Sequence, residues 1–197
     1  MKITIAPYQK GWSAQFAHIS AELKAILTGL DPVVEHVGST AVEGLAAKPI
    51  IDINVGLPRA ADLERAVERM APQRSYIYYQ AFNASMPQRR LFVKLQGAAE
   101  QLGFKPVYER LAEIPHEAIH EKRLAHVHVW VLGTADWIRH LAFRDYLRAH
   151  EAVKNEYQRL KVQLSQQEWQ DGMEYNQAKD AFIKRVEAEA VNWYNLR

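Results

Sequence analysis

The sequence predicts an α+β fold in which a sheet-containing core is followed by a helical extension. Strand-like and helix-like runs are interspersed up to about Gly133, and nearly all of the chain beyond Thr134 has helical periodicity. The chain has 197 residues, of which 48% are hydrophobic, and this is enough for one substantial core. We therefore expect a single domain made of a core at residues 1–133 and a helical extension at 134–197.

The first elements follow from short-range patterns. Residues 2–5 alternate like a short strand, and a helix is expected after them, ending near Gly29 because glycine readily takes the left-handed conformation of a helix stop. The apolar residues that mark this helix at helical spacing are Trp12, Phe16, Ile19, Leu23 and Ile26. Asp31 and Pro32 then form a turn.

The remaining core strands are β-prone runs bounded by turn residues. They are predicted at residues 33–37, 50–55, 76–79, 91–95 and 125–131. A helix marked by Leu63, Val67 and Met70 separates the second strand from the third, and residues 83–90 join the third to the fourth. The segment 97–122 has no period that assigns it to either class.

Three helices are expected after Thr134. The first is marked by Trp137, Leu141 and Tyr146 and ends near His150. The second is marked by Val153, Tyr157, Leu160 and Leu164, and a last helix covers about residues 169–193.

Composition narrows the classes of function. The chain has no cysteine, which excludes disulfides, thiolate zinc sites and a cysteine nucleophile. The start of the chain does not resemble a signal peptide and no apolar run reaches membrane-spanning length, so we expect a cytoplasmic protein. The formal net charge is +2 and basic residues are scattered, which favours a small anionic ligand over an extended nucleic acid or a membrane.

The most informative motif joins a turn of small residues to an acidic strand. Gly38, Ser39 and Thr40 follow a predicted strand, and Asp52 and Asn54 lie on the next one with their side chains on the same face. A turn of this kind lets backbone N–H groups and a hydroxyl approach phosphate oxygens closely. A carboxylate facing it can hold a divalent metal ion that bridges phosphates.

The stretch from Glu35 to Ile53 resembles the signature of the GrpB family, which is assigned to the nucleotidyltransferase (DNA polymerase β-like) superfamily. Later parts of the chain also resemble family blocks in the expected order, namely residues 87–94, 126–129 and 141–150, followed by Tyr175, Lys179, Phe182 and Ile183. Glu43 stands where the family usually has proline. The resemblance implies a nucleotidyltransferase-like mixed β-sheet core with flanking helices.

The resemblance also implies a set of acidic positions, which this chain fills only in part. Active superfamily members carry two acids one residue apart and a third on a later strand, whereas here Asp52 is followed by Asn54 and the later strand carries His126 and His128. We expect Asp52 and Asn54 at the catalytic position. Asp52, His126 and His128 together would bind a divalent metal ion, magnesium or manganese, or zinc because of the nitrogen donors. Alternatively, the two histidines simply line a sheet face.

Basic residues supply further phosphate-binding candidates. Arg90 and Lys94 share one face of their strand and suit a phosphate clamp, or else form a solvated basic edge. Lys48 precedes the strand of Asp52 and has the same two interpretations, a phosphate-binding residue or a solvated basic residue. Among the helices, Arg144 and Lys179 are expected to hold an anion and Asp145 to act as a base. The alternative is that Arg144 and Asp145 fasten the helices to the core.

These observations predict a protein that binds a nucleotide or another phosphorylated small molecule, with metal-dependent transfer of a nucleoside monophosphate to a small acceptor as the reaction. Two alternatives remain open. One is a non-catalytic binding protein, which the amide of Asn54 favours because it brings no charge to a metal. The other is a metal-dependent hydrolase built on Asp52, His126 and His128.

Overall fold

The computed structural model describes residues 2–170 and 172–197, apart from the side chain of Met173. A five-stranded sheet forms the centre, in the order β1-β2-β5-β4-β3. The strands are β1 (Val33–Val37), β2 (Ile51–Leu57), β3 (Tyr76–Tyr78), β4 (Arg89–Leu95) and β5 (Arg123–Val131). β2 and β5 are parallel and the other neighbouring pairs are antiparallel, so the sheet is mixed and the fold is α+β.

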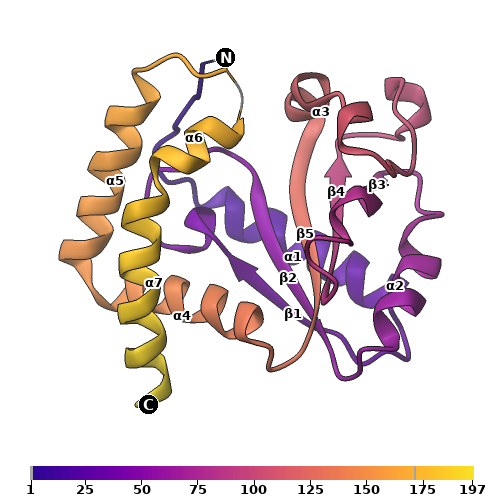
Figure 1. Ribbon diagram of the computed structural model, residues 1–197, viewed down its shortest axis with the longest axis horizontal. Helices are drawn as coiled ribbons and strands as arrows, with labels where there is room; N and C mark the ends of the chain where they lie inside the picture. The colour runs from indigo at the N-terminus through magenta and orange to yellow at the C-terminus, as the bar shows by residue number, and fades with distance from the viewer. Residues whose placement is uncertain (1, 171) are drawn as a thin grey trace.

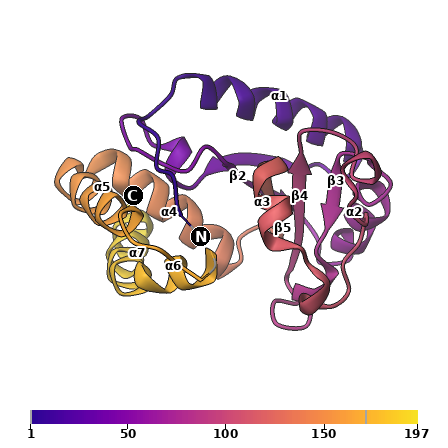
Figure 2. The same cartoon turned by 90° about the horizontal axis from the view of Figure 1, so that it is seen from above.

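The helices of the first half are α1 (Gly11–Ile26), α2 (Asp62–Met70) and the short α3 (His116–Lys122). Four more follow the last strand: α4 (Ala135–Ala149), α5 (Glu151–Ser165), α6 (Gly172–Ala178) and α7 (Asp180–Asn195). Figure 1 shows α4 to α7 grouped on one side of the sheet. Figure 2 shows α1 running along a face of the sheet that these four helices leave uncovered.

Side chains along β2 alternate between the two faces of the sheet, with apolar residues on one face and polar residues on the other. Ile51, Ile53 and Val55 are buried in the main core, which they form with α1 and α2. Asp52 and Asn54 therefore point to the opposite face, because successive strand side chains point to opposite sides. On that face Trp130 of β5 and Trp137 of α4 share an apolar cluster with Val37.

The segment after the Gly38 turn joins the helical part to the sheet. Val42 and Leu45 are buried in a cluster with side chains from α4, α5 and α7. The other buried members of this cluster are Leu147, Tyr157, Phe182 and Val186. Burial of several large apolar side chains stabilises such a contact by several kcal/mol, at about 1.5–3 kcal/mol each. The helical extension is thus packed directly against the loop that carries the turn.

Most predicted elements are present, and two predictions need correction. Residues 2–5 do not form a strand: Lys2 makes only an isolated bridge with Glu168, and the next bridge is Ala6 with Ala47. Their alternation is real, because Ile3 and Ile5 pack with Trp169, but among the described residues no continuous strand lies alongside to complete a ladder. The helix expected at 169–193 is two helices, α6 and α7, on either side of Lys179.

The segment 97–122, which the sequence left unassigned, contains short 3₁₀ turns at Glu100–Leu102 and Leu111–Glu113 and then α3. Such short turns depend on tertiary contacts more than on local periodicity. No helix in the described part of the chain is long and apolar enough to cross a membrane.

Candidate functional site

The Gly38 turn lies directly against Asp52. Val37 and Asp52 are Cα partners in the antiparallel β1–β2 pair, and the chain turns at Gly38 with φ of 70°. A Cβ at residue 38 would lie 2.4 Å from Oδ2 of Asp52, which is far inside van der Waals contact. Only glycine fits both the positive φ and this close approach. The predicted pairing of turn and carboxylate is therefore present.

His126 is the hydrogen-bond partner of Asp52. The two residues are Cα partners on the parallel strands β2 and β5, and Nδ1 of His126 lies 2.9 Å from Oδ1 of Asp52. Burial lowers the pKa of His126, although Asp52 opposes this. Burial by itself raises the pKa of Asp52, but the hydrogen bond to His126, with smaller electrostatic contributions from His126, His128 and Arg123, outweighs it and leaves the pKa low. At neutral pH a neutral imidazole therefore donates its Nδ1 proton to an ionised carboxylate.

Solvent reaches this pair, although protein surrounds it. The side chains of Asp52 and His126 are 36% and 27% exposed, yet burial is the largest single influence on both pKa values. An accessible group with protein on most sides is available to a ligand in a low-dielectric setting, where charge interactions are stronger than in bulk water.

Three lysines surround the turn and Asp52 from outside the sheet. Nζ of Lys161, on α5, lies 3.0 Å from Oγ of Ser39 and 2.5 Å from the carbonyl oxygen of Ala46. The ammonium groups of Lys48 and Lys179 lie 4.4 and 4.2 Å from the ring centroid of Tyr175. The charge of Asp52 acts on both Lys48 and Lys179.

These lysines hold their protons weakly. Burial, helped by the charge of Lys179, lowers the pKa of Lys161 to about 7. Burial lowers the pKa of Lys48 to about 8, with contributions from Lys179 and Arg123. Burial also lowers the pKa of Lys179 to about 8, against the attraction of Asp52. Within residues 2–170 and 172–197, none of the three forms an ion pair with a carboxylate.

Arg123, at the start of β5, adds a fourth cation near Asp52. Its guanidinium lies 2.6 Å from Nδ1 of His120, and its buried Nε has no hydrogen-bond partner among the described residues. Its charge acts on Lys48, Asp52 and His126. One carboxylate therefore stands among four basic side chains, and the site as a whole has an excess of positive charge.

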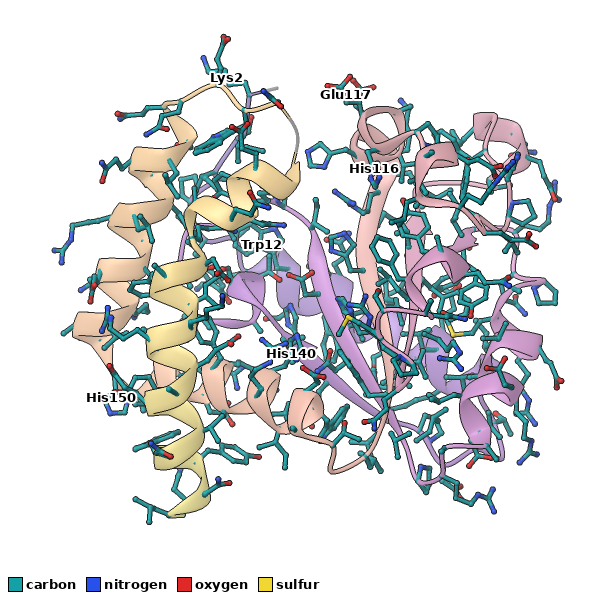
Figure 3. All side chains as sticks on the ribbon, viewed as in Figure 1. Lys2, Trp12, His116, Glu117, His140 and His150 are labelled. Carbon is teal, nitrogen blue, oxygen red and sulfur yellow. The ribbon has the colours of Figure 1, made fainter. Side chains whose placement is uncertain are left out.

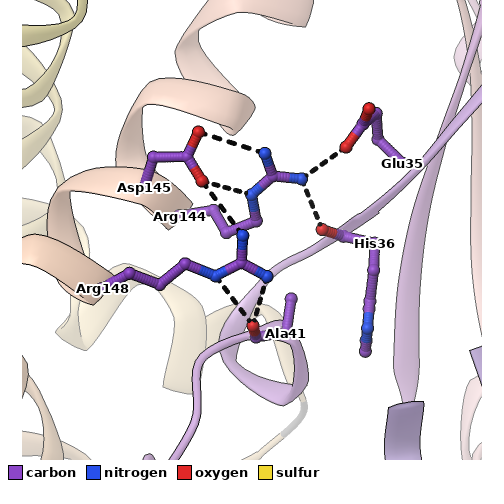
Figure 4. Close-up of polar contacts among 6 residues, drawn as sticks. All are labelled: Glu35, His36, Ala41, Arg144, Asp145 and Arg148. Atoms are coloured by element: carbon purple, nitrogen blue, oxygen red, sulfur yellow. Dashed lines mark hydrogen bonds and ion pairs between the residues drawn. The ribbon is translucent and has the colours of Figure 1, made fainter.

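Two arginines of α4 hold the backbone on both sides of the turn (Figure 4). Arg144 donates to the carbonyl oxygen of His36 at 3.0 Å and to Oε2 of Glu35 at 2.6 Å. Arg148 donates twice to the carbonyl oxygen of Ala41, at 3.1 and 2.8 Å. Asp145 accepts from both guanidinium groups. The backbone at residues 36 and 41, on either side of the Gly38 turn, is therefore hydrogen-bonded to α4.

This arrangement agrees with the fastening alternative for Arg144 and Asp145 rather than with roles in binding and base catalysis. Arg144 has only 10% of its side chain exposed and makes four bonds within the protein. Burial raises the pKa of Asp145, but the hydrogen bonds and charges of Arg144 and Arg148 outweigh it and hold the pKa low. An ionised carboxylate with two arginines is a weak proton acceptor.

Asn54 and His128 lie further along the same face of β2 and β5. Asn54 is fully buried, and its Oδ1 accepts a hydrogen bond from Nε1 of Trp130 at 3.0 Å. The ring of His128 stacks on that of Trp130, with centroids 6.1 Å apart, and lies 6.0 Å from the ring of His140. Figure 3 shows where α4 carries His140. Asn54 thus serves the packing of this face.

The donor set for a metal ion is small. Asp52 and His126 are together, but the described residues contain no group of three or more His, Asp or Glu side chains placed to hold a metal. The trio of Asp52, His126 and His128 is not assembled as a metal site among these residues, and the ring of His128 packs on Trp130. Two protein donors do not make a closed metal site.

Arg90 and Lys94 lie away from Asp52. Val93 is the Cα partner of His126, so Lys94 and Arg90 point to the opposite face of the sheet. Lys94 donates to Glu22 of α1 at 2.6 Å and to Ser75 at 2.8 Å, and Arg90 pairs with Glu64 of α2. Both residues fasten helices to the sheet. The predicted shared face of Arg90 and Lys94 is present, but it is the wrong face for contact with the turn.

Three residues of the site were not recognised from the sequence as part of it: Lys161, Arg123 and His120. The position of Lys161 could have been recognised from the sequence pattern. It follows Tyr157 by four residues and lies beside Leu164 on the buried stripe of α5, where a lysine is unusual. No sequence pattern marked Arg123 and His120, because they lie at the end of the segment 97–122, which has neither helical nor strand periodicity.

Fold and site define an α+β protein in which a glycine-serine turn, an ionised carboxylate and a group of basic residues meet on one face of a mixed sheet. Residues 2–189 match the family described as GrpB protein, and the chain belongs to this family.

Relatives and a solved structure agree with this assignment. The chain is 31% identical over 192 residues to UPF0157 protein YqkA of Bacillus subtilis, covering 98% of this chain and 48% of that protein. It thus spans about half the length of YqkA. It is 35% identical over 193 residues to UPF0157 protein PA4798 of Pseudomonas aeruginosa, covering 96% of this chain and 68% of that one. The crystal structure of conserved protein GrpB from Enterococcus faecalis matches with a TM-score of 0.76 and 34% identity, over 97% of this chain and 99% of that one.

Proposed function

We propose that this protein binds a nucleotide or another phosphorylated small molecule, with a phosphate group held between the Ser39 turn and the lysines. The observation that carries the proposal is the group formed by Lys48, Lys161 and Lys179, which have lowered pKa values and no carboxylate partner among the described residues. Unpaired cations in a partly buried setting are costly, so a protein retains them where an anion binds.

A phosphate group suits this site for two reasons. It carries up to two negative charges, which matches an excess of basic over acidic side chains around Asp52. Its oxygens accept several hydrogen bonds at once, and the site offers the ammonium donors of the three lysines. The four helices beyond the sheet supply Lys161 and Lys179, so the ligand we propose is small enough to lie between them and β2.

Nucleotidyl transfer is the second candidate, and the ionised state of Asp52 favours it. Asp52 and His126 provide two donors, so we propose that a divalent cation, magnesium or manganese, arrives with the nucleotide and completes its shell with phosphate oxygens. Zinc is also compatible with the imidazole. The burial of Asn54 against Trp130 supports binding without catalysis, because that amide is not free to act on a metal.

The test is calorimetric titration of the protein with ATP, ADP, coenzyme A and inorganic pyrophosphate, with and without Mg²⁺ or Mn²⁺. We expect binding of at least one of these probes, and a loss of about tenfold in affinity for Lys48→Met or Lys179→Met, since each removes a charged donor. Lys184→Met is the matched control, because this lysine is 73% exposed and pairs with Asp180 of its own helix. Equal affinity of all three variants and the wild type would overturn the proposal.

Asp52→Asn separates the two candidates. A site that binds a bare anion loses a repulsive charge in this variant, so affinity for metal-free pyrophosphate rises. A site that receives a metal-nucleotide complex loses a metal ligand, so affinity for Mg-ATP falls and pyrophosphate release from ATP stops. Product formation is followed by thin-layer chromatography of labelled nucleotide.

A further inference from the structure

Lys161 differs from the other two lysines of the site in its burial and its contacts. Only 3% of its surface is exposed, whereas Lys48 and Lys179 are half-buried. Its ammonium contacts the carbonyl oxygen of Ala46, the hydroxyl of Ser39 and the ring of Tyr157, whose centroid lies 4.5 Å away. All three partners are uncharged. A cation in this position is solvated by dipoles alone.

Burying the ammonium group of Lys161 in this way costs free energy unless a bound anion compensates its charge. Removing a charge from water costs several kcal/mol, and neutral hydrogen-bond partners recover only part of this. Stability alone would favour an apolar residue here, because Lys161 lies on the buried stripe of α5 between Tyr157 and Leu164. A lysine at this position is therefore better explained by a ligand than by packing.

We propose that Lys161 is the residue through which the Ser39 turn recognises a fully charged tetrahedral dianion, and that it takes up a proton when the dianion binds. This inference rests on the proposed function and adds a recognition residue and a ligand charge state to it. The same side chain contacts Ser39, so the amine and the hydroxyl meet a ligand at that turn together.

The titratable groups around Lys161 determine the direction of the pH effect. Lys179 faces it from the junction of α6 and α7 and lowers its pKa further, and Tyr157 lies on its own helix. On the sheet side the carboxylate of the site is Asp52, which packs against Gly38. The pKa of the amine is about 7 in the free protein, and a bound dianion raises it.

Affinity for a dianion is therefore constant below about pH 7, where the amine is already charged. Above that pH it falls, by up to about tenfold per pH unit, because a proton must be taken up for the ion to bind. Lys48 and Lys179 add a second fall that begins near pH 8. The onset of the decline thus distinguishes Lys161 from the other two.

The experiment is calorimetric titration with sodium sulfate between pH 6 and 9, in buffers of different ionisation enthalpy. Sulfate remains a dianion throughout, so every proton taken up on binding comes to the protein. For the wild type we expect the decline to begin near pH 7, with proton uptake at pH 7.5. For Lys161→Met we expect about tenfold weaker binding at pH 6.5 and a decline that begins near pH 8. Melting temperatures and far-ultraviolet circular dichroism establish that each variant is folded.

Lys161→Arg is the decisive variant, because it keeps the charge and does not titrate in this range. It should bind sulfate at pH 6.5 within about threefold of the wild type, with proton uptake at pH 7.5 reduced to less than about half. Wild-type affinity in Lys161→Met, or unchanged proton uptake in Lys161→Arg, overturns the role of Lys161 while anion binding stands. Failure of the wild type to bind sulfate or any of ATP, ADP, coenzyme A and pyrophosphate overturns this inference and the proposed function together.

Discussion

Gly38 and Asp52 touch so closely that residue 38 has no room for a side chain: a Cβ there would lie 2.4 Å from the carboxylate oxygen and 3.0 Å from Cβ of Asp52. The contact fixes the position of the turn relative to β2. It also places the hydroxyl-bearing residue Ser39 next to Asp52, the carboxylate around which the site is built. Four predictions follow from this geometry and its surroundings.

Gly38→Ala should cost more stability than any other glycine substitution of similar φ. The positive φ costs about 1 kcal/mol and the clash with Asp52 adds about 1–3 kcal/mol. Gly103→Ala is the control, because Gly103 has φ of 79° and nothing within 4 Å of its added Cβ. Urea unfolding compares the two. Equal losses would show that Asp52 can move away from the turn at no cost.

Asp52→Asn should lower stability at neutral pH and have no effect in acid. The folded pKa of Asp52 is below its ordinary value of 3.8, so the carboxylate stabilises the fold above that value, and this contribution disappears as pH falls through the folded pKa. Wild type and variant are compared by urea unfolding at pH 7 and at several acid values. A difference that stays constant with pH would mean that ionisation of Asp52 is not involved.

Arg144→Met should destabilise the protein strongly. The substitution removes a guanidinium that is only 10% exposed, leaves Glu35 without its partner and leaves Asp145 with Arg148 alone, and such losses cost about 2–4 kcal/mol. Because Arg144 also holds the carbonyl oxygen of His36, pyrophosphate affinity should fall as the turn loosens. Arg185→Met serves as control: its pair with Glu156 is about half exposed on both sides, so solvent screens it and its loss should cost much less. Similar losses in the two variants would contradict the fastening role.

Lys94→Met should affect stability without affecting ligand binding. Its ammonium pairs with Glu22 and Ser75 on the face of the sheet opposite Asp52, and losing this part-buried pair costs about 1–3 kcal/mol. Pyrophosphate affinity of the folded variant should equal that of the wild type in the titration used for Lys48→Met. A comparable loss of affinity would place Lys94 in the site after all.

Local patterns were sufficient for most elements of the fold. The spacing of Trp12 to Ile26 predicted α1, and the β-prone runs predicted the strands, because helical and strand periods are properties of neighbouring residues. Local patterns failed where a partner far along the chain decides the outcome. Residues 2–5 alternate but have no strand beside them, and the helix expected at 169–193 is interrupted near Lys179.

The sequence by itself determined the family, the α+β class and the pairing of the Gly38 turn with Asp52, since these depend on residue order and spacing along one hairpin-like segment. Only the tertiary structure decided which basic residues reach that turn. Arg90 and Lys94 are attached to the sheet but on its opposite face, whereas Lys161 lies 122 residues from Ser39 and reaches it because α5 packs beside the turn. Which cation lies near which anion depends on how the helices pack on the sheet. The spacing of residues along the sequence does not predict that packing.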